Sequence, residues 1–251
     1  MNRIGCILAG CVVIGLAPPA RAYRPFDGTD ADVAGAGEVE LELGPVEVSR
    51  SASRSTWIAP AMIFNYGVVR DFELVIEGRH QIERPVDTSA VHSVLTDSAI
   101  SIKEVLQDGC LQGHPGISIA NEWSVLFADT GSRQSLGAEL TTIFSVRWRL
   151  STLHLNVYNE LTRQGHFAGS IGPIIEGPYT WPVRPVMELI ATREFGSARL
   201  NQGLFGSTLI GMIGRLGKDL SLDCAVLYAK SHDVREEAFR AGFTWSFDTG
   251  F

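Results

Sequence analysis

The sequence predicts an all-β protein, a transmembrane antiparallel β-barrel of about 12 strands. Three observations predict it: an N-terminal export signal, long runs in which apolar and polar residues alternate, and an aromatic final strand that ends on Phe251. The chain has 251 residues, of which 45% are hydrophobic and 20% charged, a composition typical of folded proteins. Its formal charge of −7 argues against non-specific nucleic-acid binding, which needs a surplus of Lys and Arg.

The N-terminus has the form of an export signal. An arginine precedes an apolar core over residues 4–17, and a small-x-small cleavage site follows at residues 20–22. An alternative is a lipoprotein cleavage site at Cys11, which would cut the apolar core in two. Cleavage after Ala22 predicts three parts: a signal peptide that is removed (1–22), a periplasmic N-terminal segment (23–37) and the barrel (38–251).

The segment before the barrel is rich in Gly, Asp and Ala and shows no periodicity, so we expect a loose leader there. From Glu38 onward apolar and polar residues alternate, which is the period-two pattern of a strand with two unlike faces. The alternation predicts eleven strands, near residues 38–48, 57–66, 71–82, 97–107, 116–127, 137–149, 153–163, 184–195, 204–215, 219–230 and 236–251.

A twelfth strand follows from the connections. Short turns near residues 67–71, 150–152 and 216–219 must all lie at one end of an up-and-down barrel. This requires another strand near residues 168–177, although Gly172 and Pro173 make its own alternation poor. With an even number of strands, both chain ends lie at the same end of the barrel, which we expect to face the periplasm.

Alternation alone does not distinguish a soluble sandwich from a barrel whose apolar face meets lipid. The export signal, strand lengths that suit a tilted membrane crossing, and the last strand together favour lipid. That strand resembles the signal read by the barrel-assembly machinery, with its aromatic residues in alternation: Phe243, Trp245, Phe247 and the terminal Phe251. The expected location is the outer membrane of a Gram-negative bacterium, among outer-membrane lipids.

The polar residues of the strands are then expected to line the lumen. The candidates are Glu40, Glu73, Glu77, Arg79, Lys103, Glu122, Glu139, Arg147, Arg149, His154, Asn156, Glu160, Glu188, Asp223 and Arg240, with Glu38, Glu42 and Glu194 on the same faces. Their acidic surplus predicts a narrow pore that favours cations or neutral solutes. The alternative is an ion-pair network that plugs and stiffens the barrel, as in a structural or adhesion protein.

The sequence also resembles a known family through several short motifs. They are Tyr23-Arg-Pro-Phe-Asp-Gly-Thr-Asp, Gly37-Glu38-Val39-Glu40-Leu41-Glu42, Asn65-Tyr66-Gly67 before Phe72-Glu73-Leu74, Asp97 with Lys103, His154-Leu155-Asn156, Glu188, and Gly242-Phe243-Thr244-Trp245-Ser246-Phe247. Over most of residues 23–251 they resemble the meta-pathway phenol-degradation outer-membrane family, which is distantly similar to long-chain fatty acid transporters. The resemblance implies passage of small, often hydrophobic, molecules across the outer membrane.

A hydrophobic solute would need an apolar route. Glycines and prolines over residues 164–184 predict weak strand pairing, so a lateral opening could form there. Its apolar lining would be Phe167, Ile171, Tyr179 and Trp181. The alternative is a long surface loop with a short strand.

The sequence carries no catalytic motif. There is no Gly-x-Ser-x-Gly, no His-Glu-x-x-His and no glycine-rich phosphate loop. His154 and Asn156 share a face, but no serine has a spacing that marks a triad, so His154 is interpreted as a lumenal hydrogen-bonding residue. Cys110 and Cys224 have no metal-site spacing. We expect no enzyme activity, cofactor or metal, with an outer-membrane lipid hydrolase as a second alternative.

Overall fold

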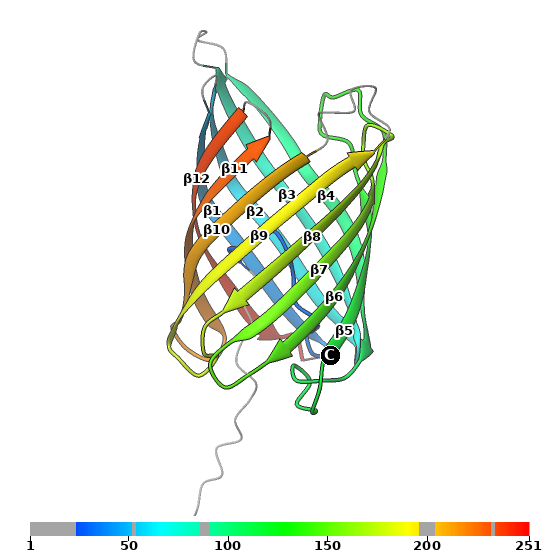
Figure 1. Ribbon diagram of the computed structural model, residues 1–251, viewed down its shortest axis with the longest axis vertical. Coiled ribbons are helices and arrows are strands. Elements are labelled where there is room, and N and C mark those ends of the chain that lie inside the picture. The colour runs from blue at the N-terminus through cyan, green and yellow to red at the C-terminus, as the bar shows by residue number, and fades with distance from the viewer. Residues whose placement is uncertain (1–23, 52–53, 86–90, 196–203, 232–233, 251) are drawn as a thin grey trace, which may run out of the picture.

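The computed structural model describes residues 24–51, 54–85, 91–195, 204–231 and 234–250. These residues form a closed barrel of twelve antiparallel strands, each paired with its neighbours in chain order (Figure 1). The strands are β1 (Glu38–Ser51), β2 (Arg54–Val69), β3 (Phe72–Pro85), β4 (His92–Gln107), β5 (Ser118–Leu126), β6 (Gly137–Arg147), β7 (Thr152–Leu161), β8 (Phe167–Glu176), β9 (Val183–Phe195), β10 (Leu204–Arg215), β11 (Leu220–Ser231) and β12 (Val234–Asp248). In the described part of the chain, no helix is long and apolar enough to cross a membrane.

The first and last strands close the barrel. Glu38 at the start of β1 pairs with Asp248 at the end of β12, so the strands begin and end at one end of the barrel. We call this the terminal end; the turn at residues 70–71 also lies there, because Val39 near the start of β1 pairs with Tyr66 near the end of β2. The shared end was predicted from strand parity. That it faces the periplasm stays a prediction.

The strand inferred from parity is present. β8 pairs with β7 along its whole length, including Gly172 and Pro173. Against β9 the ladder is interrupted at these two residues, between the pairs Ile171–Ala191 and Ile174–Glu188. Proline has no N–H to donate, but the register continues across the gap and the wall is closed.

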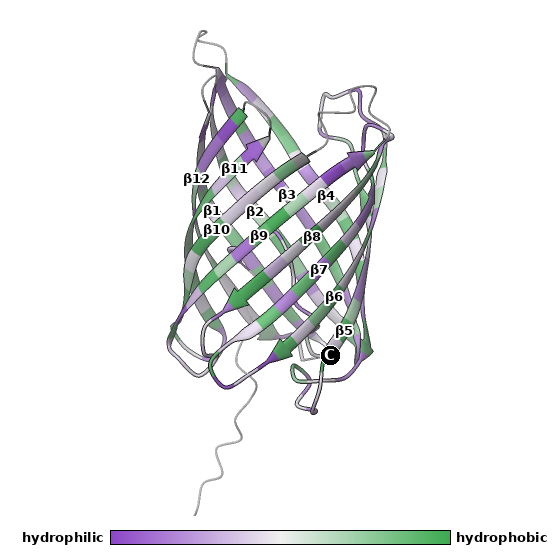
Figure 2. Cartoon of the chain, viewed as in Figure 1, coloured by the Kyte–Doolittle hydropathy of each residue, from purple (hydrophilic) through white to green (hydrophobic). Residues whose placement is uncertain are grey.

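The two faces of the wall have opposite character. Outward side chains such as Ile102, Trp123 and Val226 are more than half exposed, at 53%, 53% and 57%. Inward side chains on the same strands, such as Lys103 and Asp223, are buried. Figure 2 shows the alternation along each strand. An apolar exterior around a largely polar interior is the arrangement of an outer-membrane barrel, and it places the protein in the outer membrane.

One bulge changes which side chains face inward. Between Leu43 and Val46, β1 carries one residue more than the facing stretch of β12. The extra residue shifts the period of two, so that Glu42 and Glu47 are both buried inward. The Gly44-Pro45 pair marks this bulge, yet simple alternation over 38–48 did not predict a lumenal Glu47.

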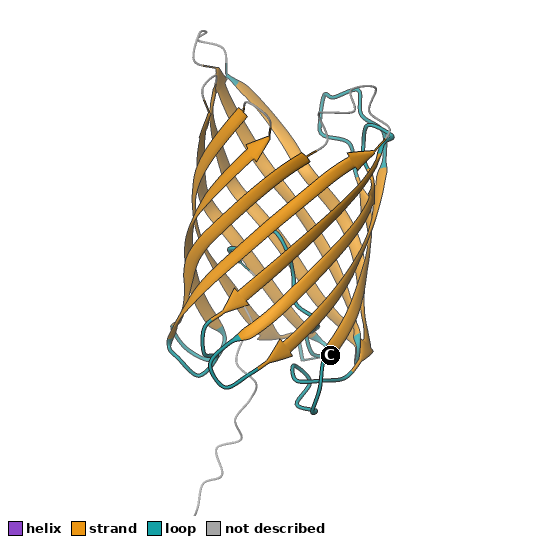
Figure 3. Cartoon of the chain, viewed as in Figure 1, coloured by secondary structure: helices purple, strands orange, loops and turns teal. Residues whose placement is uncertain are grey.

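Three predictions need correction. Residues 24–37 are not a loose leader: the chain crosses the barrel interior there, with Arg24, Phe26 and Ala31 buried (Figure 3). Arg149 lies in the exposed turn after β6 and not in the lumen, because β6 ends at Arg147. Phe167, Ile171, Tyr179 and Trp181 do not line a lateral route, since all four are 40–52% exposed on the outward face of β8 or in the following turn. The predicted signal peptide and Phe251 lie outside the described residues.

Candidate functional site

Residues 24–37, called here the lumenal segment, are fastened to the inner wall. At one end Arg24 donates its backbone N–H to Glu42 Oε2 (3.0 Å), and its Nε lies 3.6 Å from Asp223 Oδ2. Two wall glycines make room for this guanidinium. A Cβ at Gly44 would lie 2.5 Å from Arg24 Nη1, and one at Gly242 would lie 2.4 Å from Arg24 Nε.

Asp27, three residues further along the segment, is held by two arginines. Arg240 on β12 donates from Nη1 to Asp27 Oδ1 (2.7 Å) and from Nε to Glu47 (3.0 Å). Arg79 on β3 approaches the same Asp27 oxygen from Nη2 at 3.4 Å. Burial alone would raise the pKa of the Asp27 carboxyl, but the charges of Arg240 and Arg79 outweigh it and lower that pKa from 3.8 to about 2. Asp27 is therefore ionised at neutral pH.

Lumenal acids bind backbone N–H groups of the segment. Glu188 accepts from Asp27 N (2.9 Å) and from Gly28 N (2.8 Å), and Glu73 accepts from Ala34 N (2.5 Å). Asn156 accepts from Thr29 N and donates to Thr29 O. A buried segment without strand partners must satisfy its backbone polar groups in this way.

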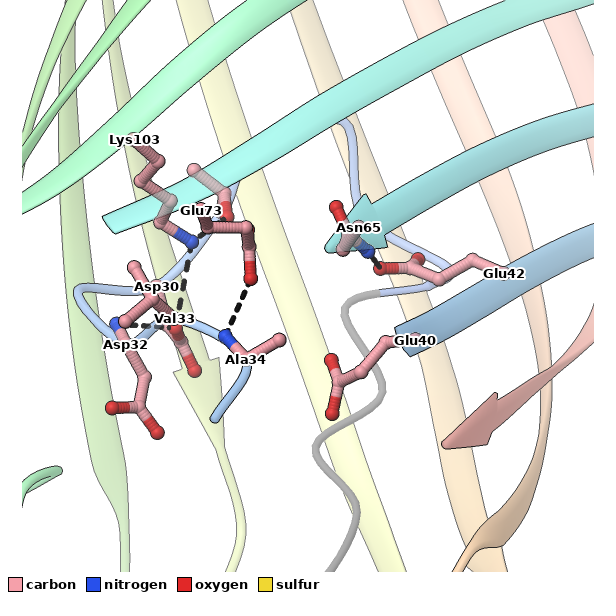
Figure 4. A pocket seen from close by; sticks show the side chains of 10 residues that line it. Asp30, Asp32, Val33, Ala34, Glu40, Glu42, Asn65, Glu73 and Lys103 are labelled. Atoms are coloured by element: carbon pink, nitrogen blue, oxygen red, sulfur yellow. Dashed lines mark hydrogen bonds and ion pairs between the residues drawn. The ribbon is translucent and has the colours of Figure 1, made fainter. Parts of the chain in front are cut away.

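A cavity of about 40 Å³ lies beside the segment (Figure 4). Lys103 reaches towards the segment from β4, with its Nζ 3.0 Å from Thr29 Oγ1 and 3.9 Å from Asp30 Oδ1. The cavity is lined further by Asp32, Val33, Ala34, Glu40, Glu42, Asn65 and Glu73. A second cavity of about 120 Å³ includes in its lining Glu77, Arg79, Glu122, Glu139 and Tyr158.

Apolar contacts add to the polar ones. Phe26 of the segment belongs to a buried cluster with Ile174, Leu209 and Ile213 from β8 and β10. Ala31 belongs to another that includes Leu111, from the loop between β4 and β5. In that loop Gln112 Nε2 donates to Ala31 O (2.7 Å). The prediction of a polar lumen missed Ile174, Leu209 and Ile213, whose inward position follows from strand parity.

The structure brings a serine to His154, although no serine has a sequence spacing that marks a triad. Ser145 Oγ is 2.7 Å from His154 Nδ1, and His154 Nε2 is 3.7 Å from Glu176 Oε1. Ser145 is 0% exposed and accepts a hydrogen bond from Ala31 N (3.0 Å). The hydroxyl thus binds the segment and is closed to any substrate in this arrangement.

The remaining candidates lie apart from these contacts. Glu139 accepts from Thr141, and Glu160 is half-buried on β7. Arg147 donates to Cys110 O and lies 4.7 Å from the centre of the Tyr179 ring. Cys110 and Cys224 are free. In the described residues no cluster of His, Cys, Asp or Glu is arranged to hold a metal ion. The outward face of β12 carries Phe243, Trp245 and Phe247, and the last two rings lie 4.8 Å apart.

No protein-family model and no curated protein sequence matches the chain. Solved outer-membrane barrels match its fold. An outer-membrane channel from Pseudomonas putida F1 aligns over 88% of this chain and 100% of its own at 8% identity, with a TM-score of 0.64. The NanC porin aligns over 82% and 98% at 5% identity (TM-score 0.60), and the KdgM porin in complex with oligogalacturonate over 84% and 99% at 8% identity (TM-score 0.54). These likenesses show the fold; they do not confirm the predicted resemblance to the phenol-degradation family.

Proposed function

We propose that the protein is an outer-membrane channel for small solutes, closed in this state by the lumenal segment. The observation that carries the proposal is that residues 24–37 lie inside the barrel without forming part of its wall. Side chains of β1, β3, β4, β6, β7, β9, β11 and β12 hold the segment. The twelve-strand ladder closes independently of it, so the segment can leave the lumen without breaking strand pairing.

The acidic lining of the lumen favours small hydrophilic solutes, neutral or cationic, as the substrates. Among the described residues around the segment, carboxylates such as Glu73, Glu122 and Glu188 outnumber cations such as Lys103, Arg79 and Arg240. The cavities of about 120 and 40 Å³ are smaller than the roughly 150 Å³ apolar cavity that accepts benzene. Solute passage therefore requires displacement of the segment. Transport of hydrophobic molecules rests on the family resemblance, and the closed wall at β8 gives it little support.

Liposome swelling tests this proposal. The full chain and a variant lacking residues 25–34 are reconstituted, and swelling is followed with a pentose and with a large oligosaccharide as the impermeant control. We expect the deletion to raise the pentose-driven rate by about ten-fold or more, as for a barrier lowered by about 1.4 kcal/mol. If the folded deletion variant gave no swelling, the alternative of a structural or adhesion barrel would replace the channel.

We also propose that the protein is not an enzyme. The trio Ser145, His154 and Glu176 resembles a hydrolase arrangement, but its hydroxyl is buried and already bound to Ala31 N. Phospholipid in mixed micelles should remain intact with the full chain. Hydrolysis that disappears in Ser145→Ala would support the lipid-hydrolase alternative.

Assembly is proposed to use the outward aromatic residues of β12 together with Phe251. Their alternation at the C-terminus supports recognition by the barrel-assembly machinery. Deleting Phe251 should lower the amount of the compact, heat-modifiable form on semi-native gels, whereas an unchanged amount would argue against this role.

A further inference from the structure

A groove of about 550 Å³ lies on the wall near the end opposite the termini. Its floor includes outward side chains of three adjacent strands: Ile210 on β10, Val226 on β11 and Phe239 on β12. These three are 56%, 57% and 49% exposed. The volume lies within the roughly 300–1,000 Å³ typical of small-molecule sites, and the floor is apolar. An outward apolar groove in a membrane-embedded wall suits a hydrocarbon chain.

Two cationic side chains lie at the edge of this groove. Lys230 on β11 pairs directly with Arg235 on β12, and both side chains are exposed on the outward face. Like charges directly opposite each other in an antiparallel pair repel. An anion between them would remove this cost. Figure 2 shows hydrophilic stretches near these ends of β11 and β12.

Residues at the rim of the groove lie next to the cations. Arg50 and Glu237 line it and pair across β1 and β12, and Tyr228 pairs with Glu237 from β11. Two residues further along the same outward face come Lys230 and Arg235. Arg50, Lys230, Arg235 and Glu237 together carry a net charge of +2. Next to Lys230, Gly206 on β10 and then Ala191 on β9 leave space beside the cationic pair.

We propose that this face binds a phosphorylated acyl glycolipid of the lipid A class. Its phosphates would lie on Lys230, Arg235 and Arg50, and one acyl chain would lie in the groove over Ile210, Val226 and Phe239. Cations that are costly on a lipid-facing surface at mid-membrane are tolerated at its edge, where lipid phosphates lie. The choice of an outer-leaflet lipid uses the predicted periplasmic position of the terminal end.

Native mass spectrometry of the full chain in a neutral detergent tests the proposal. Bis-phosphorylated lipid A, phosphatidylglycerol and phosphatidylcholine are added in parallel. We expect one lipid A to bind at least about ten-fold more tightly than either phospholipid, and the double change Lys230→Gln/Arg235→Gln to remove that preference. Ile210→Trp, which fills the groove and keeps the cations, should weaken lipid A binding as well. Arg149→Gln, an exposed arginine at the terminal end, is the matched control and should change nothing.

Two outcomes would overturn the proposal. Equal binding of phosphatidylcholine, which is zwitterionic, would show that the cations do not select an anionic headgroup. Equal effects of the double change and the control, in variants that keep heat-modifiable mobility, would show the same. A preference for phosphatidylglycerol over lipid A would assign the face to a glycerophospholipid and contradict the lipid A assignment. Neither outcome depends on whether the lumen conducts.

Discussion

Arg240 on the last strand donates a 2.7 Å hydrogen bond to Asp27, which lies 213 residues earlier in the lumenal segment. The same guanidinium holds Glu47 of β1 and the carbonyl of Pro25. One side chain thus joins the two strands that close the barrel to the segment that fills it.

Removing the Asp27 carboxylate should free this part of the segment from the wall. Asp27→Asn keeps the shape of the side chain but removes the charge held by Arg240 and Arg79. Hydrogen bonds to charged groups contribute about 1.5–3 kcal/mol each, so the open probability in bilayer recordings should rise by about ten-fold or more. The double variant Arg240→Gln/Asp27→Asn should have an open probability only a little higher than that of either single variant. Full additivity would show that the two residues act independently.

Gly67 on β2 should tolerate no side chain while the segment is in place. A Cβ there would lie 2.0 Å from Gly35 O and 2.4 Å from Ala34 O, and Gly67 O accepts from Gly37 N (2.8 Å). Gly67→Ala should therefore displace residues 34–37 and increase cleavage of the segment by added protease. Gly206→Ala is the matched strand glycine, because its Cβ would meet no atom closer than 3.7 Å. Equal cleavage of the two variants would contradict the close approach.

Acid should loosen the segment. The pKa of Asp27 in the folded protein, about 2, lies below its ordinary value of 3.8. Its stabilising contribution is therefore complete above about pH 4 and is lost as the pH falls through about 2. Open probability should rise over that window in the wild-type chain. The Asp27→Asn variant should lack this rise in open probability. If the wild-type chain and the variant responded to acid in the same way, the result would argue against the ion pair.

Ion selectivity should follow the lumenal charges once the segment is removed. In the variant lacking residues 25–34, Glu73→Gln and Glu122→Gln should each lower the cation preference measured from reversal potentials. Lys103→Met should raise it, because it removes a cation from the same part of the wall. Glu104→Gln is the control, since Glu104 follows Lys103 and points outward. A shift in the control as large as that for Glu73→Gln would rule out lumenal control of selectivity.

The strands could be predicted because the membrane imposes a period of two on every one of them. Even β8, whose Gly172 and Pro173 obscure the alternation, followed from the requirement that short turns share one end. The lumenal position of Glu47 could not be predicted from alternation, because the bulge at Gly44-Pro45 shifts the period.

The position of the lumenal segment could not be predicted from the sequence, for a different reason. Residues 24–37 have no periodicity, and their partners Ser145, Asn156 and Glu188 lie more than 100 residues away in the sequence. The acids predicted for the lumen were interpreted as pore-lining groups. Glu73 and Glu188 instead accept the N–H groups of the segment, a role that depends on packing between distant parts of the chain.

Planar-bilayer recording of the full chain beside the variant lacking residues 25–34 tests the central claim most directly. The full chain should be mostly closed, with rare small openings. The deletion variant should show steady discrete conductance steps with cation preference, and a synthetic peptide of residues 24–37 added to the bath should block them. A heat-modifiable deletion variant that stays silent, or a full chain that conducts as steadily as the deletion variant, would contradict the account.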